Sequence, residues 1–247
     1  AAEDPLIFLV LGSNTVVRDG GIKGTVVITQ GALNQLKCLD PVTLYAEAGV
    51  ASPALARFAA RKNLTGAEFL AGIPGTIGGA LAMNAGCSGC ETWNIVKSVI
   101  TLNRHGEKKT RFPSEYEIAY RQVSVFPDEY YLAAHFQLEP VAKEKSLAKI
   151  RSLLLHRATT QPTNEPNCGS VFRNPAGDYA ARLIESCGLK GLKVGDASVS
   201  TKHANFIINE GRATAADIES LIEKITDIVF QIHHIQLIRE VRIIGII

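Results

Sequence analysis

The segment from Cys168 to Pro175 combines residue types that could place one hydroxyl group for chemistry. Gly169 permits backbone angles and close contacts that other residues forbid, and Ser170 follows it directly. Two large apolar residues come next and can anchor the serine in a core. Arg173 and Asn174 then supply a cation and an amide for an anionic or polar ligand. The segment predicts a fixed serine hydroxyl in a cleft, although a strand end with an ordinary polar turn explains the same spacing.

A glycine and hydroxyl-rich loop follows the apolar run 6–11 near the N-terminus. It contains Gly12, Ser13 and Asn14, and a second part, Asp19 to Gly21, comes soon after. Backbone N–H groups in such a loop can hold phosphate oxygens. The loop matches neither the Walker pattern nor the G-x-G-x-x-G fingerprint. Taken alone, it is explained equally well by a β-turn.

A second glycine-rich loop precedes an apolar helix expected over residues 76–84. It contains Gly72, Gly75, Thr76, Gly78 and Gly79. The last two glycines cost about 1 kcal/mol each inside a helix relative to alanine. Close approach of a ligand's pyrophosphate or ring would compensate for that cost. Tight packing of the helix on a strand is the alternative, but two such loops together favour a bound dinucleotide.

Two further segments contain charged residues that are candidates for a ligand site. Arg121, after Tyr120, could neutralise a carboxylate through two parallel hydrogen bonds, or could be an ordinary surface arginine. Glu240 and Arg242 fall on one face of the expected final strand because side chains alternate along a strand. A charged pair there indicates either an exposed edge or a lined cleft.

Composition narrows the classes of protein. The chain has 247 residues, which is long enough for two domains or one large one. Of these residues 46% are hydrophobic, enough for substantial cores, and 20% are charged, as is ordinary for a globular protein. A net charge of +2 gives no reason to expect nucleic acid or an anionic membrane, and the apolar runs are too short to span a bilayer. Five irregularly spaced cysteines indicate a reducing compartment. The Cys87/Cys90 pair lacks a second pair, so we expect no metal site and leave a redox role open.

Strand and helix signals alternate along the whole chain. We expect strands at 6–11, 25–28, 42–46, 130–138, 193–199, 205–209 and 237–247, and a hairpin formed by 96–102 and 108–112. We expect helices at 147–157, 178–187 and after Thr214, and one that starts with Ser52 as N-cap and Pro53 in the first turn. The proline and charges of residues 139–145 indicate a domain boundary.

Taken together, these motifs resemble the UDP-N-acetylenolpyruvoylglucosamine reductase (MurB) family, and the resemblance runs through nearly the whole chain. The glycine loops alone would indicate only the broader vanillyl-alcohol-oxidase-like flavoproteins, whereas the later segments are far more specific. The segments that carry the resemblance are residues 11–14, 72–79, 84–86, 120–121, 168–175, 202–209 and 240–242.

The resemblance implies an α+β fold. A two-part FAD-binding domain of the vanillyl-alcohol-oxidase-like group would cover residues 1–140, and an α/β substrate-binding domain residues 141–247. It implies FAD as cofactor and NADPH as co-substrate. NADPH would reduce the flavin, which would then reduce the enolpyruvyl ether of UDP-N-acetylglucosamine to UDP-N-acetylmuramate for peptidoglycan synthesis. We expect a cytoplasmic monomer that binds this small molecule and neither nucleic acid nor membrane.

The resemblance also assigns roles to individual residues. Arg121 and Glu240 would polarise the substrate carboxylate, and Ser170 would donate a proton to carbon. Tyr120, Arg173 and Asn174 would bind the substrate. The cofactor would lie against Gly12, Ser13, Asn14, Gly72, Gly75, Thr76, Gly78, Gly79 and Asn84.

Some features depart from the family pattern. The chain lacks an inserted tyrosine loop, which indicates the shorter second type of the family, and His234 stands where relatives usually have glycine. Relatives also have a further N-terminal segment that contributes to the FAD site, so we expect this chain to begin within the fold. A sugar or alcohol oxidase on the same scaffold, or an inactive nucleotide-binding fragment, remain the alternatives.

Overall fold

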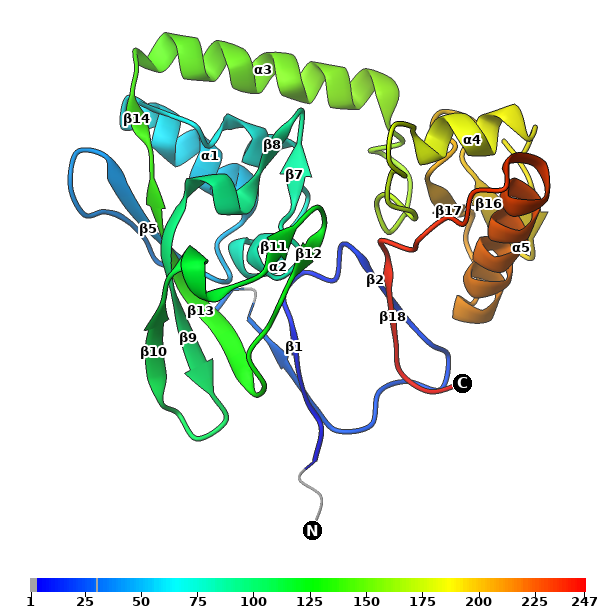
Figure 1. Ribbon diagram of the computed structural model, residues 1–247, viewed down its shortest axis with the longest axis horizontal. Coiled ribbons are helices and arrows are strands. Elements are labelled where there is room, and N and C mark those ends of the chain that lie inside the picture. The colour runs from blue at the N-terminus through cyan, green and yellow to red at the C-terminus, as the bar shows by residue number, and fades with distance from the viewer. Residues whose placement is uncertain (1–3, 30) are drawn as a thin grey trace. The chain divides into compact units, whose positions relative to one another are not determined.

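The computed structural model describes residues 4–29 and 31–247, which form two compact units (Figure 1). Unit 1 contains residues 4–6, 12–25 and 158–247, and unit 2 contains residues 7–11 and 26–157. The last passage between units, at residues 157–158, lies further along the chain than the boundary expected at 139–145. Cofactor-binding and substrate-binding domains at 1–140 and 141–247 stay a prediction.

A five-stranded antiparallel sheet forms the framework of unit 2. Its order is β10-β9-β13-β5-β4, and Leu44, Val99 and Phe136 on its strands are fully buried. The long β9–β13 pairing contains two register shifts, which increase the local twist of the sheet. The strands are β4 (Leu36–Cys38), β5 (Thr43–Glu47), β9 (Val96–Asn103), β10 (Lys108–Arg111) and β13 (Glu129–Gln137).

Helices and short strand pairs complete unit 2 (Figure 1). The helices are α1 (Ser52–Arg61), α2 (Ile77–Ala82) and α3 (Lys143–Thr160), whose last residues belong to unit 1, with 3-10 turns at Glu68–Gly72, Thr92–Ile95 and Pro113–Glu115. The pairs are β6 (Leu64–Thr65) with β14 (Glu139–Pro140), β7 (Gly86–Cys87) with β8 (Cys90–Glu91), and β11 (Ile118–Ala119) with β12 (Gln122–Val123). The pair β1 (Leu6–Leu9) with β3 (Thr25–Ile28) contains residues of both units.

Unit 1 has its own core beneath two helices. Helix α5 begins with a capping box in which Thr214 and Asp217 exchange hydrogen bonds, and its buried face includes Leu221, Ile225 and Val229. The elements are β2 (Thr15–Val17), α4 (Ala180–Ser186), β15 (Lys193–Val194), β16 (Ala197–Val199), β17 (Ile207–Asn209), α5 (Ala215–His233) and β18 (Arg242–Ile244). Strands β15, β16 and β17 form an antiparallel sheet, and β2 pairs in parallel with β18.

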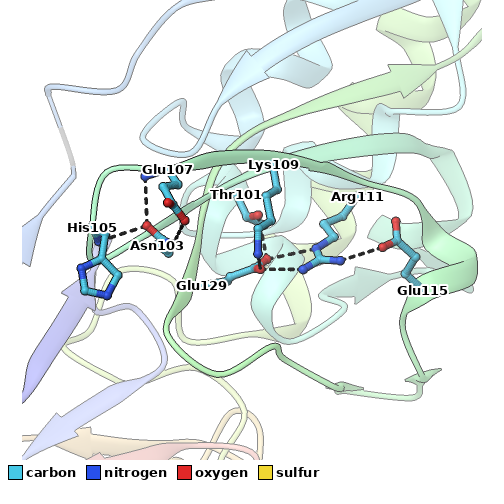
Figure 2. Close-up of polar contacts among 8 residues, drawn as sticks. All are labelled: Thr101, Asn103, His105, Glu107, Lys109, Arg111, Glu115 and Glu129. Atoms are coloured by element: carbon cyan, nitrogen blue, oxygen red, sulfur yellow. Dashed lines mark hydrogen bonds and ion pairs between the residues drawn. The ribbon is translucent and has the colours of Figure 1, made fainter.

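A charged cluster ties the β9–β10 hairpin to β13 in unit 2 (Figure 2). Glu129 accepts hydrogen bonds from Thr101 Oγ1 at 2.8 Å, Lys109 Nζ at 3.2 Å and Arg111 Nη2 at 2.6 Å. Arg111 also bonds to Glu115 Oε1 at 2.9 Å. The hydrogen bond from Arg111 is the main reason why the pKa of Glu129 falls to about 2. The cluster therefore stabilises this part of the sheet while Glu129 is ionised.

The α+β class is confirmed, and so are most of the expected elements. The strand 25–28 and the hairpin of β9 and β10 lie where the sequence predicts them, and α5 begins directly after Thr214. The N-cap of α1 is an exception, because Ala51 rather than Ser52 holds that position. Ala51 is fixed by a bridge to Thr76, and the Ser52 N–H bonds to Gly75 O at 2.9 Å.

Two predicted strands are wrong in extent. Residues 193–199 form a hairpin because Gly195, at φ 52°, turns the chain between Val194 and its partner Ala197. The final strand covers only Arg242–Ile244. Before it, the N–H groups of Glu240 and Val241 both bond to a single carbonyl, so the regular ladder is interrupted there.

Candidate active site

Ser170 lies in unit 1 between a turn and a buried anchor. Gly169 before it has φ 78°, a conformation that favours glycine, and Val171 and Phe172 after it are each 1% exposed. Ser170 itself is half-buried, and its hydroxyl makes no hydrogen bond to any residue that the structure describes. The predicted fixed serine is therefore present on a rigid segment, with its hydroxyl available to a ligand.

Asn205 holds the segment that follows Ser170. Its Oδ1 accepts a hydrogen bond from Phe172 N at 2.9 Å, and its Nδ2 donates one to Phe172 O at 2.8 Å. Its backbone carbonyl also accepts from Val171 N at 3.0 Å. Asn205 is 4% exposed, and its side-chain amide satisfies the buried N–H and C=O groups of Phe172, which a neighbouring strand would otherwise do. The sequence alone assigned Asn205 no role beyond its place in the segment 202–209, which carries part of the family resemblance.

Glu240 and Asn14 meet the same segment from two distant parts of the chain. Glu240 N donates to Val171 O at 2.8 Å, and Asn14 Nδ2 donates to Glu240 O at 3.0 Å. Arg242 N in turn donates to Asn14 O at 2.9 Å. Ser170, Glu240 and Asn14 are thus neighbours in unit 1, although 226 positions separate Asn14 from Glu240.

Arg173 and Asn174 have different environments. Arg173 Nε is buried and has no hydrogen-bond partner among the described residues, so it can donate to an added ligand. Asn174 Oδ1 accepts from Ala180 N at 3.1 Å at the start of α4. Part of the Asn174 amide therefore supports the fold, and substrate contact by both residues stays a prediction.

Arg121 lies in unit 2, where its guanidinium contacts groups of the β7–β8 hairpin and of the residues just before it. It occupies the two-residue turn between β11 and β12 with φ 55°, and its side chain is 15% exposed. Its Nη2 donates to Gly86 O at 2.8 Å, its Nη1 donates to Asn84 O at 3.3 Å, and Nη1 lies 3.8 Å from Glu91 Oε1. The Arg121 guanidinium also lies over the ring of Tyr120, 4.8 Å from its centroid. Tyr120 is 43% exposed, so this aromatic ring remains accessible.

The buried side chain of Asn84 holds together the groups that surround Arg121. It is 1% exposed, its Nδ2 donates to Glu91 Oε2 at 2.8 Å and to Ala119 O at 3.1 Å, and its Oδ1 accepts from Trp93 N at 3.1 Å. These contacts use both ends of the amide. Asn84 thus positions the groups around Arg121, and the contact with cofactor predicted for it stays untested.

The second glycine loop contains one structural glycine and one open glycine. A Cβ on Gly78 would lie 3.0 Å from Ala48 Cβ, and Gly78 N donates to Ala48 O at 2.8 Å, so helix–strand packing explains Gly78. Outside its own helix, the one described atom within 4 Å of a Cβ on Gly79 would be Val10 Cγ2, at 3.8 Å. Packing therefore leaves Gly79 unexplained, which is the result expected of a glycine that admits a ligand.

Buried hydroxyl groups beside this loop fit a phosphate-bearing cofactor. Thr76 is 3% exposed and stands at the N-cap of α2 without making a side-chain cap bond. Thr76 Oγ1 and Ser52 Oγ have no hydrogen-bond partner among the described residues. Thr76 pairs with Ala51, the residue directly before Ser52. Since buried hydroxyls are costly without partners, these two suit a ligand with acceptor oxygens.

The first glycine loop has two parts with different uses. Gly12, at φ 72°, turns the chain, and Ser13 O lies 3.6 Å from where a Cβ on Gly169 would stand. The Asp19 carboxylate instead accepts hydrogen bonds from the first two N–H groups of α5, at 3.0 and 3.1 Å. The N–H groups of Gly20 and Gly21 donate to Ile246 O at 3.1 Å and to Arg18 O at 2.9 Å, so the fold already uses them, and a phosphate role for Asp19 to Gly21 stays a prediction without support from this geometry.

The predicted site residues fall into two groups, one in each unit. Unit 1 contains Gly12, Ser13, Asn14, Ser170, Arg173, Asn174 and Glu240, and unit 2 contains Gly72, Gly75, Thr76, Gly78, Gly79, Asn84, Tyr120 and Arg121. Within residues 4–29 and 31–247, no cluster of three or more His, Cys, Asp or Glu side chains could hold a metal ion. No helix in that part of the chain is long and apolar enough to cross a membrane.

The fold and these sites define a flavin-dependent oxidoreductase. The model of an FAD binding domain matches residues 1–110, and the model of the UDP-N-acetylenolpyruvoylglucosamine reductase C-terminal domain matches residues 161–244. Together with relatives more than 50% identical over 98% of this chain, these matches show that the chain belongs to the UDP-N-acetylenolpyruvoylglucosamine reductase (MurB) family.

Individual relatives agree over almost the whole chain. The UDP-N-acetylenolpyruvoylglucosamine reductase of Legionella pneumophila (strain Corby) is 59% identical over 98% of this chain and 79% of its own length. The reductase of Methylococcus capsulatus is 53% identical over 98% of this chain and 80% of its own length. The crystal structure of MurB from Thermus caldophilus superposes with a TM-score of 0.86 at 32% identity, covering 98% of this chain and 86% of that one.

Proposed function

We propose that this chain reduces UDP-N-acetylglucosamine enolpyruvate to UDP-N-acetylmuramate with NADPH, in peptidoglycan precursor synthesis. Bound FAD would supply hydride transfer, between NADPH and the terminal carbon of the enolpyruvyl double bond. The protein's own groups then have to hold the substrate, stabilise charge that develops toward its carboxylate, and deliver a proton to the adjacent carbon. Family membership supports the reaction, and the geometry of Ser170 supports the assignment of proton delivery to the protein.

The proton is assigned to Ser170 Oγ. The observation that carries this assignment is a half-buried hydroxyl without a partner among the described residues, on a segment whose next residues are almost fully buried. A serine is a weak acid, so its contribution depends on placement close to the carbon rather than on a shifted pKa. The Asn205 and Glu240 backbone contacts supply that placement.

Arg121 and Glu240 are assigned to the substrate carboxylate. Arg121 is held from one side by the Gly86 carbonyl and has a carboxylate, Glu91, close enough to orient it. Glu240 is held beside the segment of Ser170 because its N–H donates to Val171 O at 2.8 Å, and the N–H of the next residue, Val241, donates to the same carbonyl at 3.3 Å. Tyr120, Arg173 and Asn174 are assigned to the rest of the sugar nucleotide, and Arg173 contributes a buried donor that has no other partner among the described residues.

The two regions divide the work. Residues 1–140 bind FAD through Gly12, Ser13, Asn14, Gly72, Gly75, Thr76, Gly78, Gly79 and Asn84, and residues 141–247 bind the substrate together with Tyr120 and Arg121. The protein acts as a cytoplasmic monomer with NADPH as its co-substrate. Measuring the rate of flavin reduction by NADPH, and the mass of the FAD-loaded protein in solution, would test these last points.

The central experiment is Ser170→Ala in FAD-loaded protein, followed by anaerobic stopped-flow absorbance. Bleaching of the flavin by NADPH should stay within about twofold of wild type, whereas recovery on adding the enolpyruvyl substrate should slow by about 10²–10⁴-fold, the usual contribution of a general acid. Ser186→Ala is the matched control, because that hydroxyl bonds to Leu183 O and to the His233 ring, neither of which belongs to the predicted site. Equal slowing of both steps would remove the proton-donor role, and recovery only in oxygen would indicate an oxidase.

A further inference from the structure

Two cysteines face each other across the tight β7–β8 hairpin in unit 2. Cys87 and Cys90 are register partners, and Ser88 and Gly89 between them turn the chain with φ 53° and 79°. Directly opposed residues of an antiparallel pair project from the same face of the sheet. Their Cα atoms are then about 4.5–5.5 Å apart, within the range of about 4.4–6.8 Å seen in disulfides. Both thiols are free and partly exposed.

We propose that Cys87 and Cys90 are a redox modification site: a small-molecule disulfide converts them into a reversible intramolecular disulfide that slows the enzyme by disturbing Arg121. The disulfide itself depends only on the hairpin. Its effect on turnover rests on the proposed function of Arg121.

The Arg157 guanidinium interacts electrostatically with Cys87, and we take Cys87 as the thiol that reacts first. The other cysteines are poorer candidates for pairing. Burial raises the pKa of Cys168 to about 11 and raises that of Cys187. Cys38 is exposed, but its register partner is a leucine.

The exchange needs no group other than the oxidant. The Cys87 thiolate attacks one sulfur of oxidised glutathione, forming a mixed disulfide and releasing one glutathione thiolate. The Cys90 thiolate then attacks the Cys87 sulfur, forming the protein disulfide and releasing the second glutathione. The two protein thiols lose two electrons and two protons in total, and the glutathione disulfide gains them as two thiols.

The coupling to Arg121 follows from covalent neighbours. Gly86, whose carbonyl accepts from Arg121 Nη2 at 2.8 Å, precedes Cys87, and Glu91, whose Oε1 lies 3.8 Å from Arg121 Nη1, follows Cys90. Directly opposed Cβ atoms are about 4.5–5.5 Å apart, whereas a disulfide holds them at about 3.8 Å. Closing the bond therefore tightens the hairpin by about 1 Å, and a displacement of that size at a reacting group can cost about 10²-fold in rate.

The test uses FAD-loaded protein with Cys38→Ser as the background, incubated with oxidised glutathione and then denatured in a maleimide. Mass spectrometry should find two fewer maleimide adducts than in the untreated protein, and peptide mapping should join Cys87 to Cys90. The variant Cys90→Ser should stop at a glutathione adduct on Cys87. Reoxidation of the flavin by substrate should slow by about tenfold or more in the oxidised protein, and dithiothreitol should restore it. Cys87→Ser/Cys90→Ser should keep the untreated rate after oxidation.

Several results would overturn the inference. Full maleimide labelling, or stable glutathione adducts in the wild-type pair, would show that the ring does not close. A disulfide that leaves reoxidation unchanged would refute the coupling to Arg121. Arg121→Lys is measured alongside: if it reoxidises normally, the proposed role of Arg121 fails, whereas the maleimide count still decides whether the disulfide forms.

Discussion

Asn205 offers the most direct way to test how the fold positions Ser170. Replacing it with alanine removes the hydrogen bonds of 2.9 and 2.8 Å to the backbone of Phe172, a residue that is 1% exposed. A buried backbone group left without a partner costs about 1–3 kcal/mol. Because one N–H and one C=O lose their partners, we expect Asn205→Ala to destabilise the protein by about 2–6 kcal/mol.

The effect on turnover should be confined to one half of the reaction. Once the side-chain bonds to Phe172 are lost, Ser170 is attached to a looser segment, and a displacement of about 1 Å can cost about 10²-fold in rate. Anaerobic stopped-flow absorbance should therefore show reoxidation by substrate about 10–100-fold slower, with flavin reduction by NADPH nearly unchanged. Thermal unfolding of the same samples would measure the loss of stability.

A conservative variant separates positioning from general destabilisation. Asn205→Asp keeps an acceptor for Phe172 N but places a second oxygen opposite Phe172 O. Burial and that carbonyl raise the pKa of the new carboxyl, and its protonated form can donate to Phe172 O. Reoxidation by Asn205→Asp should therefore recover as the pH falls through this raised pKa, a profile that wild type should lack.

Asn209→Ala is the matched control for this experiment. Asn209 Oδ1 also accepts from two backbone groups, Gly211 N at 2.9 Å and Ala213 N at 3.0 Å, but these lie at the far end of β17 from Asn205. It should lower the unfolding temperature and leave reoxidation unchanged. If Asn205→Ala slows both half-reactions equally, or slows neither while losing stability, then Asn205 supports the fold without positioning Ser170.

Three other perturbations follow from the structure. Wild-type stability should fall as the pH drops from about 4.5 toward 2, because the pKa of Glu129 is lowered to about 2 in the fold, and Glu129→Gln should lack this contribution of at most about 3 kcal/mol in urea titrations at different pH. Gly78→Ala should destabilise the FAD-free protein by about 1–3 kcal/mol because its Cβ would press on Ala48. Gly79→Ala should leave the FAD-free protein equally or more stable but weaken FAD binding in a fluorescence titration. Equal effects of the two substitutions on stability and on FAD binding would contradict the assignment of Gly78 to packing and Gly79 to the ligand. His234 has φ 56° at the end of α5, so His234→Gly should raise the unfolding temperature by about 2 °C, and a lower temperature would show that the histidine ring contributes more than the strain costs.

Local signals predicted the regular elements well. The capping residue Thr214, the spacing of isoleucine and leucine after it, and the turn 103–106 between two β-rich runs each act over a few residues, so α5 and the β9–β10 hairpin follow from the sequence. The failures occurred where distant segments decide. Ala51 became the N-cap of α1 because it pairs with Thr76, which lies 25 positions further on, and local cap preference could not reveal that.

The same division holds for the candidate site. The chain's motifs were specific enough to indicate the family and to nominate Ser170, Arg121 and Glu240, because the chemistry restricts the residue types at those positions. The roles of Asn205, Asn84 and Asp19 came only from the tertiary structure. Their side chains satisfy backbone groups of segments far away in sequence, and such pairings depend on which buried N–H and C=O groups the fold leaves without a strand partner.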